Sequence, residues 1–295
     1  MPTISGASKI KVVFILGATG TGKSKLAIAL GKSFNGEIIN SDKIQVYDAI
    51  PVITNRVSES EISAAPHHLL AFLPSDAEFH ATDFIHHCVD SISSITCRNH
   101  LPIVAGGSNS YIKALLEDPD FCAGHESFFI WLDAHPSILN RFVSARVDCM
   151  MQKGLVEEAR SLFDPENNDY NKGVKKAIGV PELDEYFRAE IAGSSKKEEL
   201  ERMLNEAVNN IKANTCKLIQ SQVQKIWQLK NLDRWHIHRV DVSQFLESNL
   251  AGNLNPVEEN DQWESVIGKP SRCAVKEFLD GKAGTLILNQ SEARR

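Results

Sequence analysis

Residues 17–24, Gly-Ala-Thr-Gly-Thr-Gly-Lys-Ser, match the phosphate-binding pattern GxxxxGK[ST] at every specified position. An apolar run at residues 12–16 precedes the pattern, and apolar residues at helical spacing follow it from Leu26 to Leu30. A strand, a glycine-rich loop and a helix in this order are the context that the pattern requires. The glycines let backbone amides surround phosphate oxygens, and the amino end of the helix adds partial positive charge. The motif therefore predicts a strand–loop–helix unit that binds an anion.

Two side chains of the motif have separate expected roles. Lys23 supplies a point charge for the phosphates, and the hydroxyl of Ser24 suits the coordination shell of a magnesium ion. Two kinds of ligand stay open at this point: a nucleotide whose phosphate is cleaved, and another diphosphate compound.

Apolar runs that are typical of strands recur along the chain, with helical periodicity between most of them. The expected strands are residues 11–16, 37–40, 101–105, 128–132 and 235–240. Their near-continuous apolar character suits a parallel sheet that helices cover on both faces. We therefore expect a P-loop three-layer α/β/α fold with a mainly parallel sheet and a smaller helical subdomain.

The pattern becomes mostly helical from Pro136, and one long helix is expected from about residue 196 to residue 230. After Asp241 the chain carries several Asn, Glu and Ser residues, which predicts a loose connection to a last short helix near 271–280. The expected parts are a P-loop core at 1–135, a mainly helical region at 136–234, and the last strand, loose connection and C-terminal helix at 235–295.

Composition narrows the functional classes. The net charge of −6 and the pI near 5.9 argue against a broad basic face for a nucleic-acid backbone. The six cysteines form no CxxC pair and no zinc-finger spacing, so we expect reduced thiols in an intracellular protein. No stretch is apolar for long enough to span a membrane.

The amino-terminal segment bears on the compartment. Only ten residues precede the first expected strand, too few for a signal or transit peptide. We therefore expect a cytoplasmic protein, with a plastid as the alternative if a transit peptide has been removed. We also expect a monomer.

A carboxylate follows the second expected strand. Residues 37–47, Glu-Ile-Ile-Asn-Ser-Asp-Lys-Ile-Gln-Val-Tyr, place Asp42 just past its carboxyl end, where open α/β sheets bind ligands. Asp42 would suit the acceptance of a proton or the holding of a metal-bound water. A helix N-cap or turn residue is an equally good interpretation of its position.

A glycine pair follows the third expected strand, and small hydroxyl residues then open a helix. The turn at Gly106 and Gly107 can present its backbone amides, together with Ser108, to an anion or to the edge of a base. A tight turn without a ligand is the alternative interpretation.

Asp133 ends the fourth expected strand. A Walker-type ATPase holds magnesium with such a carboxylate, so a P-loop nucleotide kinase is a competing hypothesis. The structural alternative is a cap for the helix that begins at Pro136.

Basic residues of the helical region are candidate phosphate ligands. Arg141 and Arg146 lie five residues apart and project in different directions, so at most one faces a shared site. Lys225 shares a heptad position with apolar residues 204, 211 and 218, and a lysine there either snorkels or faces an anion. Lys175 and Lys176 can reach phosphates, although two lysines on a surface turn are also common.

Two histidine pairs occur at residues 67–68 and 86–87. Neither shows a ligand pattern with Asp, Glu or Cys, so we expect packed or hydrogen-bonded imidazoles rather than a metal site.

Taken together, these stretches resemble the isopentenyltransferase family, in particular the plant-type adenylate isopentenyltransferases that make cytokinins. The phosphate loop alone is generic, whereas the ordered set is specific and covers about residues 11–240. The matching stretches are residues 17–24, 40–47, 54–55, 66–70, 106–110, 146–148, 154–158, 177–182 and 214–216.

The resemblance implies transfer of a dimethylallyl group from dimethylallyl diphosphate to N6 of a free adenine nucleotide (AMP, ADP or ATP), with release of diphosphate. The core at 1–135 would then hold the prenyl diphosphate, and the region at 136–234 would bind the acceptor. The catalytic residues implied are Asp42, Thr19, Lys23 and Arg146. The diphosphate-binding residues implied are Gly17, Ala18, Gly20, Thr21, Gly22, Lys23, Ser24 and Arg146. The acceptor-binding residues implied are Asp42, Gln45, Ser108, Asn109, Lys176 and Lys225.

The resemblance also assigns roles. Asp42 matches the family's proton acceptor, and Thr19 matches its phosphate-loop threonine near the breaking C–O bond. Lys23, Arg146, the loop amides and Mg²⁺ would stabilise the leaving diphosphate. Ser24 matches the family's magnesium-linked hydroxyl, which binds the ion directly or indirectly.

The lack of one inserted domain indicates which acceptor the resemblance favours. The tRNA-modifying relatives carry an inserted helical domain between the glycine turn and the arginine-bearing helix, whereas here residues 111–117 lead almost at once to 128–132. A free adenine nucleotide is therefore favoured, with tRNA prenylation as the alternative. The segment at 117–127 is shorter than in many nucleotide-type members, which bears on local loop contacts. Ser221 stands where the family often has a basic residue, which bears on a phosphate contact and on the preference among AMP, ADP and ATP.

Overall fold

A parallel sheet forms the centre of the structure, a computed structural model that describes residues 9–193, 196–230, 237–252 and 254–282. Its strand order is β3-β2-β4-β1-β5-β6, and all paired strands are parallel. The strands are β1 (Ile10–Gly17), β2 (Gly36–Asn40), β3 (His67–His68), β4 (Leu101–Ala105), β5 (His125–Asp133) and β6 (Ile237–Asp241).

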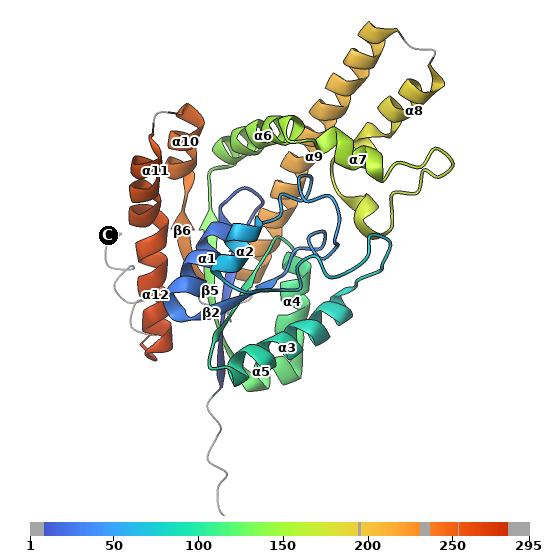
Figure 1. Ribbon diagram of the computed structural model, residues 1–295. Coiled ribbons are helices and arrows are strands. Elements are labelled where there is room, and N and C mark those ends of the chain that lie inside the picture. Colours follow the sequence, from blue (N-terminus) through green and yellow to red (C-terminus); the bar gives the residue numbers. More distant parts are fainter. Residues whose placement is uncertain (1–8, 194–195, 231–236, 253, 283–295) are drawn as a thin grey trace, which may run out of the picture.

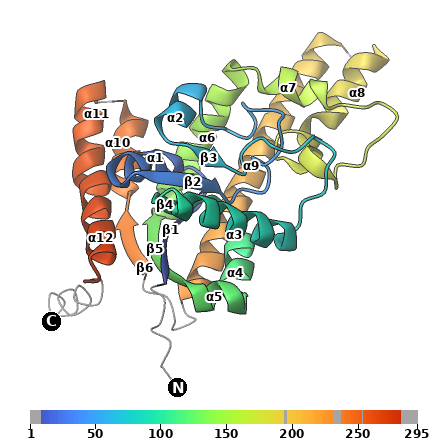
Figure 2. The same cartoon turned by 60° about the horizontal axis from the view of Figure 1, so that its bottom comes forward.

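Helices cover both faces of the sheet, which gives the expected three layers (Figures 1 and 2). One face packs against α3, α4, α5 and part of α9, and the other packs against α1, α10, α11 and α12. The helices that belong to these layers are α1 (Lys23–Phe34), α3 (Ala81–Cys97), α4 (Asn109–Glu117), α5 (Pro119–Gly124), α9 (Lys197–Lys230), α10 (Ser243–Ala251), α11 (Pro256–Trp263) and α12 (Lys269–Leu279).

The remaining helices lie towards the carboxyl edge of the sheet or beyond it (Figure 1). Helix α8 packs against the amino-terminal part of α9, and this pair projects from the rest of the molecule (Figure 1). The remaining helices are α2 (Glu59–Ala64), α6 (Pro136–Gln152), α7 (Leu155–Ser161) and α8 (Asp184–Ala192), with short 3-10 helices at Gly173–Lys176 and Pro181–Leu183. A π-helical turn at Glu264–Gly268 joins α11 to α12 in the layer on the face of the sheet.

The strand β1 shows why a parallel sheet forms here. All its residues from Val12 to Leu16 are buried, and alternate side chains join the two different cores. Since β1 lies between β4 and β5, and β4 lies beside β2, the loops that follow β1, β2 and β4 meet at one edge. This edge carries the phosphate loop, Asp42 and the glycine turn.

Most expected elements are present, with two corrections. The short strand β3 was not expected, because two residues that pair with Ile38 and Ile39 leave no periodic signal. The expected loose connection after Asp241 is wrong, since α10 and α11 occupy it. Asn255 caps α11 in a capping box with Glu258, and Phe245 and Trp263 are buried. Residues 235–236 and 283–295 of the expected last part lie outside the described residues.

The long helix α9 also corrects the expected position of Lys225. Leu218 is 40% exposed and Lys225 is exposed, because a strict heptad repeat drifts by about 20° per heptad around a straight helix. The buried stripe of α9 consists of Ala207, Ile211, Thr215, Ile219, Gln222, Ile226 and Leu229.

No helix among the described residues has both the length and the apolar character needed to cross a membrane.

A buried carboxylate ties the edge of the sheet together. Both oxygens of Glu37 on β2 accept hydrogen bonds from Arg98, at 3.0 and 2.7 Å. His68 on β3 lies 2.6 Å from one Glu37 oxygen, and His100 lies 2.6 Å from the other. Arg98 and then the two histidines hold the pKa of Glu37 at about 2, although burial opposes this shift. His68 is thus a hydrogen-bond partner of Glu37. Among the described residues, no group of three or more His, Cys, Asp or Glu side chains is arranged so that it could hold a metal ion.

We expect Glu37→Gln to lower the free energy of unfolding by about 1–3 kcal/mol at pH 7, because it removes a charged acceptor from three buried contacts. The ionised carboxylate contributes this stability above its ordinary pKa of 4.5, and the contribution is lost as the pH falls from there towards about 2. Urea unfolding at pH 7 and pH 3 checks this, with Glu126→Gln on the exposed side of β5 as the control. A stability difference between wild type and Glu37→Gln that does not shrink at pH 3 would contradict the interpretation.

Candidate active site

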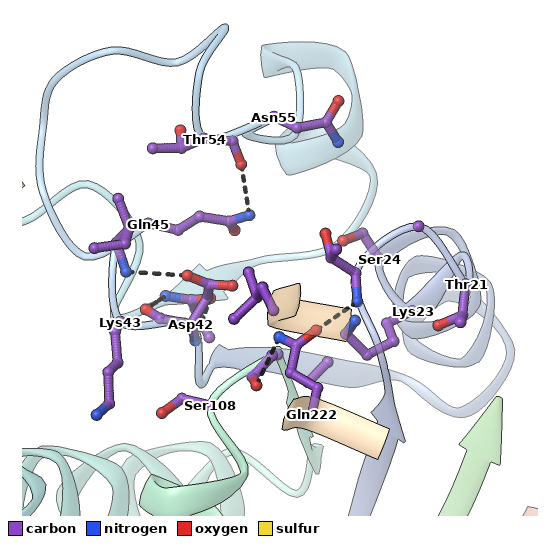
Figure 3. A pocket seen from close by; sticks show the side chains of 18 of the residues that line it. Thr21, Lys23, Ser24, Asp42, Lys43, Gln45, Thr54, Asn55, Ser108 and Gln222 are labelled. Atoms are coloured by element: carbon purple, nitrogen blue, oxygen red, sulfur yellow. Dashed lines mark hydrogen bonds between the residues drawn. The ribbon is translucent and has the colours of Figure 1, made fainter. Parts of the chain in front are cut away.

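A cavity of about 1000 Å³ opens at the carboxyl edge of the sheet. Its wall combines the loops after β1, β2 and β4 with side chains from α6, α9 and the 3-10 helix at Gly173–Lys176 (Figure 3). Two of the predicted diphosphate-binding residues, Gly17 and Ala18, do not line the cavity. The predicted site residues that line the cavity are Thr19, Gly20, Thr21, Gly22, Lys23, Ser24, Asp42, Gln45, Ser108, Asn109, Arg146, Lys176 and Lys225.

The phosphate loop is closed by its own lysine. Gly20 (φ 88°) and Gly22 (φ 90°) adopt the left-handed conformation that favours glycine, and α1 begins at Lys23 directly after Gly22. The Nζ atom of Lys23 donates a hydrogen bond to the carbonyl oxygen of Ala18 at 2.8 Å. The loop amides, the amino end of α1 and the ammonium group therefore face one small volume, which is the arrangement that binds phosphate.

Two buried cations make this volume strongly anion-selective. Burial lowers the pKa of Lys23 to about 8; Asp42 raises it and Arg146 lowers it to a smaller extent. Burial also lowers the pKa of Arg146, which Asp42 offsets in part. Arg146 donates from Nη2 to the Thr19 hydroxyl at 2.9 Å, and its buried Nε has no partner among the described residues. A bound anion would relieve the desolvation of both cations.

The position of Arg146 differs from the expectation that residues 1–135 form the diphosphate site. Arg146 belongs to the region at 136–234, yet it contacts Thr19 on the phosphate loop. Arg141, the other candidate on α6, is exposed and does not line the cavity, which agrees with the expectation that at most one of them faces the site.

Asp42 combines the two interpretations that its position left open. One oxygen, Oδ1, accepts the backbone N–H of Ile44 at 3.0 Å and so orders the turn after β2. The other oxygen faces the glycine turn, since a Cβ atom placed on Gly107 would lie 3.1 Å from Oδ2. Asp42 is therefore a turn residue that still presents one carboxylate oxygen to the cavity.

Gln222 on α9 is a site residue that the predicted list omitted. Its Oε1 accepts the backbone N–H of Thr19 at 2.9 Å, and its Nε2 donates to the carbonyl oxygen of Gly107 at 3.0 Å (Figure 3). The side chain of Asn109 in turn donates to the backbone oxygen of Gln222 at 3.0 Å. One buried amide thus joins the phosphate loop to the glycine turn. A polar residue on the buried stripe of α9 is the sequence signal that could have identified it.

Three lysines of the cavity wall form a second group of positive charges. Lys43, Lys176 and Lys225 all line the cavity, and burial, then Lys225 and Lys176, lower the pKa of Lys43. Figure 3 shows Lys43 and the phosphate loop on opposite sides of Asp42. Lys43 was not predicted as a site residue, although it follows Asp42 directly; Lys175 does not line the cavity. The cavity therefore has a second group of cations besides Lys23 and Arg146, and Asp42 is close enough to act on the charges of both Lys23 and Lys43.

Asp133 serves the sheet rather than the cavity. It is 7% exposed, and Arg239 on β6 donates a hydrogen bond to its Oδ2 from Nε at 2.7 Å. The Nη2 atom of Arg239 lies 2.6 Å from the same oxygen in an ion pair. The Oδ1 atom of Asp133 accepts the backbone N–H of Ala134 at 3.0 Å. Asp133 does not line the cavity, so the geometry offers no support for the Walker-type role on which the kinase hypothesis depends.

The donor set suits a divalent ion that is held mostly by its ligand and by water. Ser24 of the phosphate loop lines the cavity. Asp42 is close enough to Lys23 for its negative charge to raise the pKa of that lysine. Magnesium keeps several waters and binds through few protein oxygens when phosphates are present. The residues therefore fit Mg²⁺ bound with a diphosphate.

The family described as IPP transferase matches residues 45–127 and 120–228 of this chain. Adenylate isopentenyltransferase 5, chloroplastic, of Arabidopsis thaliana is 46% identical over 274 residues, which cover 92% of this chain and 81% of that protein. The chain belongs to the IPP transferase family.

Further comparisons agree with this assignment. Adenylate isopentenyltransferase 7, mitochondrial, of Arabidopsis thaliana is 45% identical over 92% of this chain and 81% of its own length. The crystal structure of a eukaryotic dimethylallyltransferase acting on tRNA has a TM-score of 0.75 at 24% identity, over 93% of this chain and 80% of that chain. The resemblance inferred from the motifs and the expected fold class are both confirmed.

The pKa of Lys23 predicts how anion binding depends on pH. Above about pH 8 the free protein loses the Lys23 proton, so the affinity for inorganic diphosphate in the presence of Mg²⁺ should fall as the pH rises. Titration calorimetry between pH 6.5 and 9.5 measures this. The ligand titrates too, and Lys23→Met provides the profile in which only that effect remains. Equal slopes for wild type and Lys23→Met would contradict the prediction.

Replacement of Gln222 by Leu should weaken diphosphate binding by about tenfold, because the N–H of Thr19 and the carbonyl of Gly107 lose a buried partner. The matched control is Gln220→Leu, an exposed position on the same helix. Calorimetry with inorganic diphosphate and Mg²⁺ compares the two variants. Similar affinities for both would show that the Gln222 bridge does not order the loop.

Proposed function

We propose that this chain transfers a dimethylallyl group from dimethylallyl diphosphate to N6 of a free adenine nucleotide, with release of diphosphate, as in cytokinin biosynthesis. One observation carries the proposal: Asp42 lies between two separate cationic sites. Prenyl transfer to a nucleotide needs an anion site for each substrate and a base between them. A nucleotide kinase also binds two phosphorylated molecules, but Asp133, on which that hypothesis depends, does not line the cavity. The names of the plant relatives as adenylate isopentenyltransferases support the same reaction.

On the donor side, the phosphate-loop residues and Arg146 bind the diphosphate of the prenyl donor. Negative charge grows on the diphosphate as its bond to C1 breaks, so Lys23 and Arg146 stabilise the transition state more than the ground state. Bound Mg²⁺ would neutralise further charge on the leaving diphosphate. The hydroxyl of Thr19, which Arg146 orients, lies beside the expected position of the breaking C–O bond.

On the acceptor side, Asp42 accepts the proton of the attacking N6 amine. The new N6–C1 bond forms as the C1–O bond breaks, and the electron pair of the C1–O bond leaves with the diphosphate. Gln45, Ser108 and Asn109 would contact the nucleotide beside Asp42. We assign the nucleotide phosphates to Lys43, Lys176 and Lys225, because all three line the cavity and Lys43 is close enough to feel the charges of Asp42 and of the other two lysines.

The proposal treats the free nucleotide as the acceptor. A single short helix, α5 (Pro119–Gly124), connects α4 to β5 at the place where the tRNA-specific insertion would occur. Transfer to a tRNA anticodon stem-loop is therefore the alternative outcome of the same assay.

Compartment and assembly follow as secondary proposals. The two Arabidopsis relatives are named as chloroplastic and mitochondrial proteins. We propose an organelle as the place of action, with the cytoplasm as the alternative expected from the sequence. We also propose a monomer, since all the site residues named above come from one chain.

The test incubates purified protein with Mg²⁺, dimethylallyl diphosphate and, separately, AMP, ADP, ATP and a tRNA stem-loop. We expect prenylated nucleotide, and Asp42→Asn should lower kcat by about 10²–10⁴-fold because the general base is lost. Mass spectrometry of the nucleotide measures the product, and Asp120→Asn on the surface of α5 is the control. Prenylation of the stem-loop alone would overturn the assigned acceptor. Nucleotide cleavage without prenyl transfer would overturn the reaction itself.

A further inference from the structure

A hydrogen-bonded turn at residues 50–56 forms part of the cavity wall. Ile53, Thr54 and Asn55 of this turn line the cavity. Inside the turn, the N–H of Thr54 donates to the carbonyl of Ile50 at 3.1 Å, and the N–H of Arg56 donates to that of Pro51 at 3.0 Å. A turn this short cannot supply partners for the amides at its amino end, so these need an acceptor from elsewhere.

The missing acceptor is Glu158 on α7. Its Oε1 accepts the N–H of Val52 at 2.9 Å, and its Oε2 accepts the N–H of Ile53 at 2.9 Å. A carboxylate that accepts two consecutive amides makes charge-assisted hydrogen bonds and also offsets the positive end of the turn. Its neighbour Glu157 is exposed, so the two adjacent glutamates have different surroundings.

The anchored turn contacts Gln45, one of the residues predicted to bind the acceptor. The amide of Gln45, three residues after Asp42, donates from Nε2 to the carbonyl of Thr54 at 3.1 Å (Figure 3). Ile53 also packs under the loop that follows Lys176, since a Cβ atom on Gly179 would lie 3.4 Å from Ile53 Cγ2. The position of this turn therefore sets both the Gln45 amide and the loop beside Lys176.

The anchor comes from the element that also serves the donor side. Helix α6 carries Arg146, which holds Thr19, and α7 follows α6 directly after Gly154 (φ 100°). Glu158 is thus the point where the α6–α7 arm is hydrogen-bonded to the acceptor wall.

We propose that Glu158 is a positioning residue for the nucleotide acceptor. It holds the turn at 50–56 in the geometry that fixes the Gln45 amide in the cavity wall, and it does so without touching either substrate. The inference rests on the proposed function for its kinetic consequence. Without the anchor, the turn must be ordered when the acceptor binds, and this cost weakens acceptor binding but not donor binding.

The variants are Glu158→Ala, which removes both bonds, and Glu158→Asp, which keeps both oxygens on a shorter side chain. Glu157→Ala controls for charge on α7. Asp118→Ala controls for stability, because Asp118 caps α5 through the N–H of Phe121 at 2.8 Å, away from the cavity wall. Hydrogen exchange of the Val52 and Ile53 amides, melting temperature, kcat and both KM values are measured for each protein.

We expect Glu158→Ala to raise the acceptor KM by about 10–100-fold while the donor KM stays within about twofold. Val52 and Ile53 should lose exchange protection, and Glu158→Asp should recover part of both effects. Glu157→Ala should match wild type. Asp118→Ala should lower the melting temperature without this KM split.

Three results would overturn the inference: equal changes in both KM values, the same split in Asp118→Ala, or unchanged protection of Val52 and Ile53 in Glu158→Ala. A wild-type protein that transfers no prenyl group would instead reject the proposed function. The anchoring role of Glu158 would then be tested by the exchange protection of the Val52 and Ile53 amides and by the affinity for ADP. Glu158→Ala should still lower both. Retained protection and unchanged ADP affinity would reject the anchor as well.

Discussion

The site depends on the parallel hydrogen bonding of β2, β4 and β1 in the middle of the sheet. Val104 of β4 lies opposite Phe14 of β1 and Ile39 of β2, and this register fixes where each strand ends. A slip by one residue would turn every buried side chain to the other face, so the two cores enforce the register. The phosphate loop, the glycine turn and Asp42 are neighbours for this reason, although the chain separates them widely.

The electrostatics of the cavity follow from this placement. The helix end brings Lys23 over the phosphate loop, and Arg146 arrives from α6, so two desolvated cations share a space with one carboxylate. Lys43, Lys176 and Lys225 repel one another, which lowers the pKa of Lys43. Such an arrangement is unfavourable without anions, and the ligands that it favours are two phosphorylated molecules that meet at Asp42. The net charge of −6 did not indicate these cationic groups, because acidic residues elsewhere in the chain outnumber the few cations of the cavity.

Two side chains that contact only the backbone hold the loops in place. Gln222 joins the phosphate loop to the glycine turn, and Glu158 anchors the turn at 50–56. Neither was identified as a site residue from the sequence, although both occur in stretches that carry the family resemblance or lie next to them. A side chain that binds a main-chain amide leaves no pattern at the partner position, because any residue type offers that amide. Such anchors become visible only when the distances are known.

The sequence by itself determined the fold class, the phosphate loop, the family and a set of site residues, most of which line the cavity. These rest on local patterns, namely apolar runs, glycine spacing and ordered motifs, which depend on neighbours along the chain. The expected loose connection after Asp241 was wrong because capping and burial in α10 and α11 outweighed a polar composition, and the heptad through Lys225 drifted off the buried stripe of α9. Only the tertiary structure decided that Asp133 pairs with Arg239, that Lys43 joins Lys176 and Lys225, and that Gln222 and Glu158 tie the loops together. Each of these is a contact between segments far apart in the chain, and its geometry is set by how the layers pack.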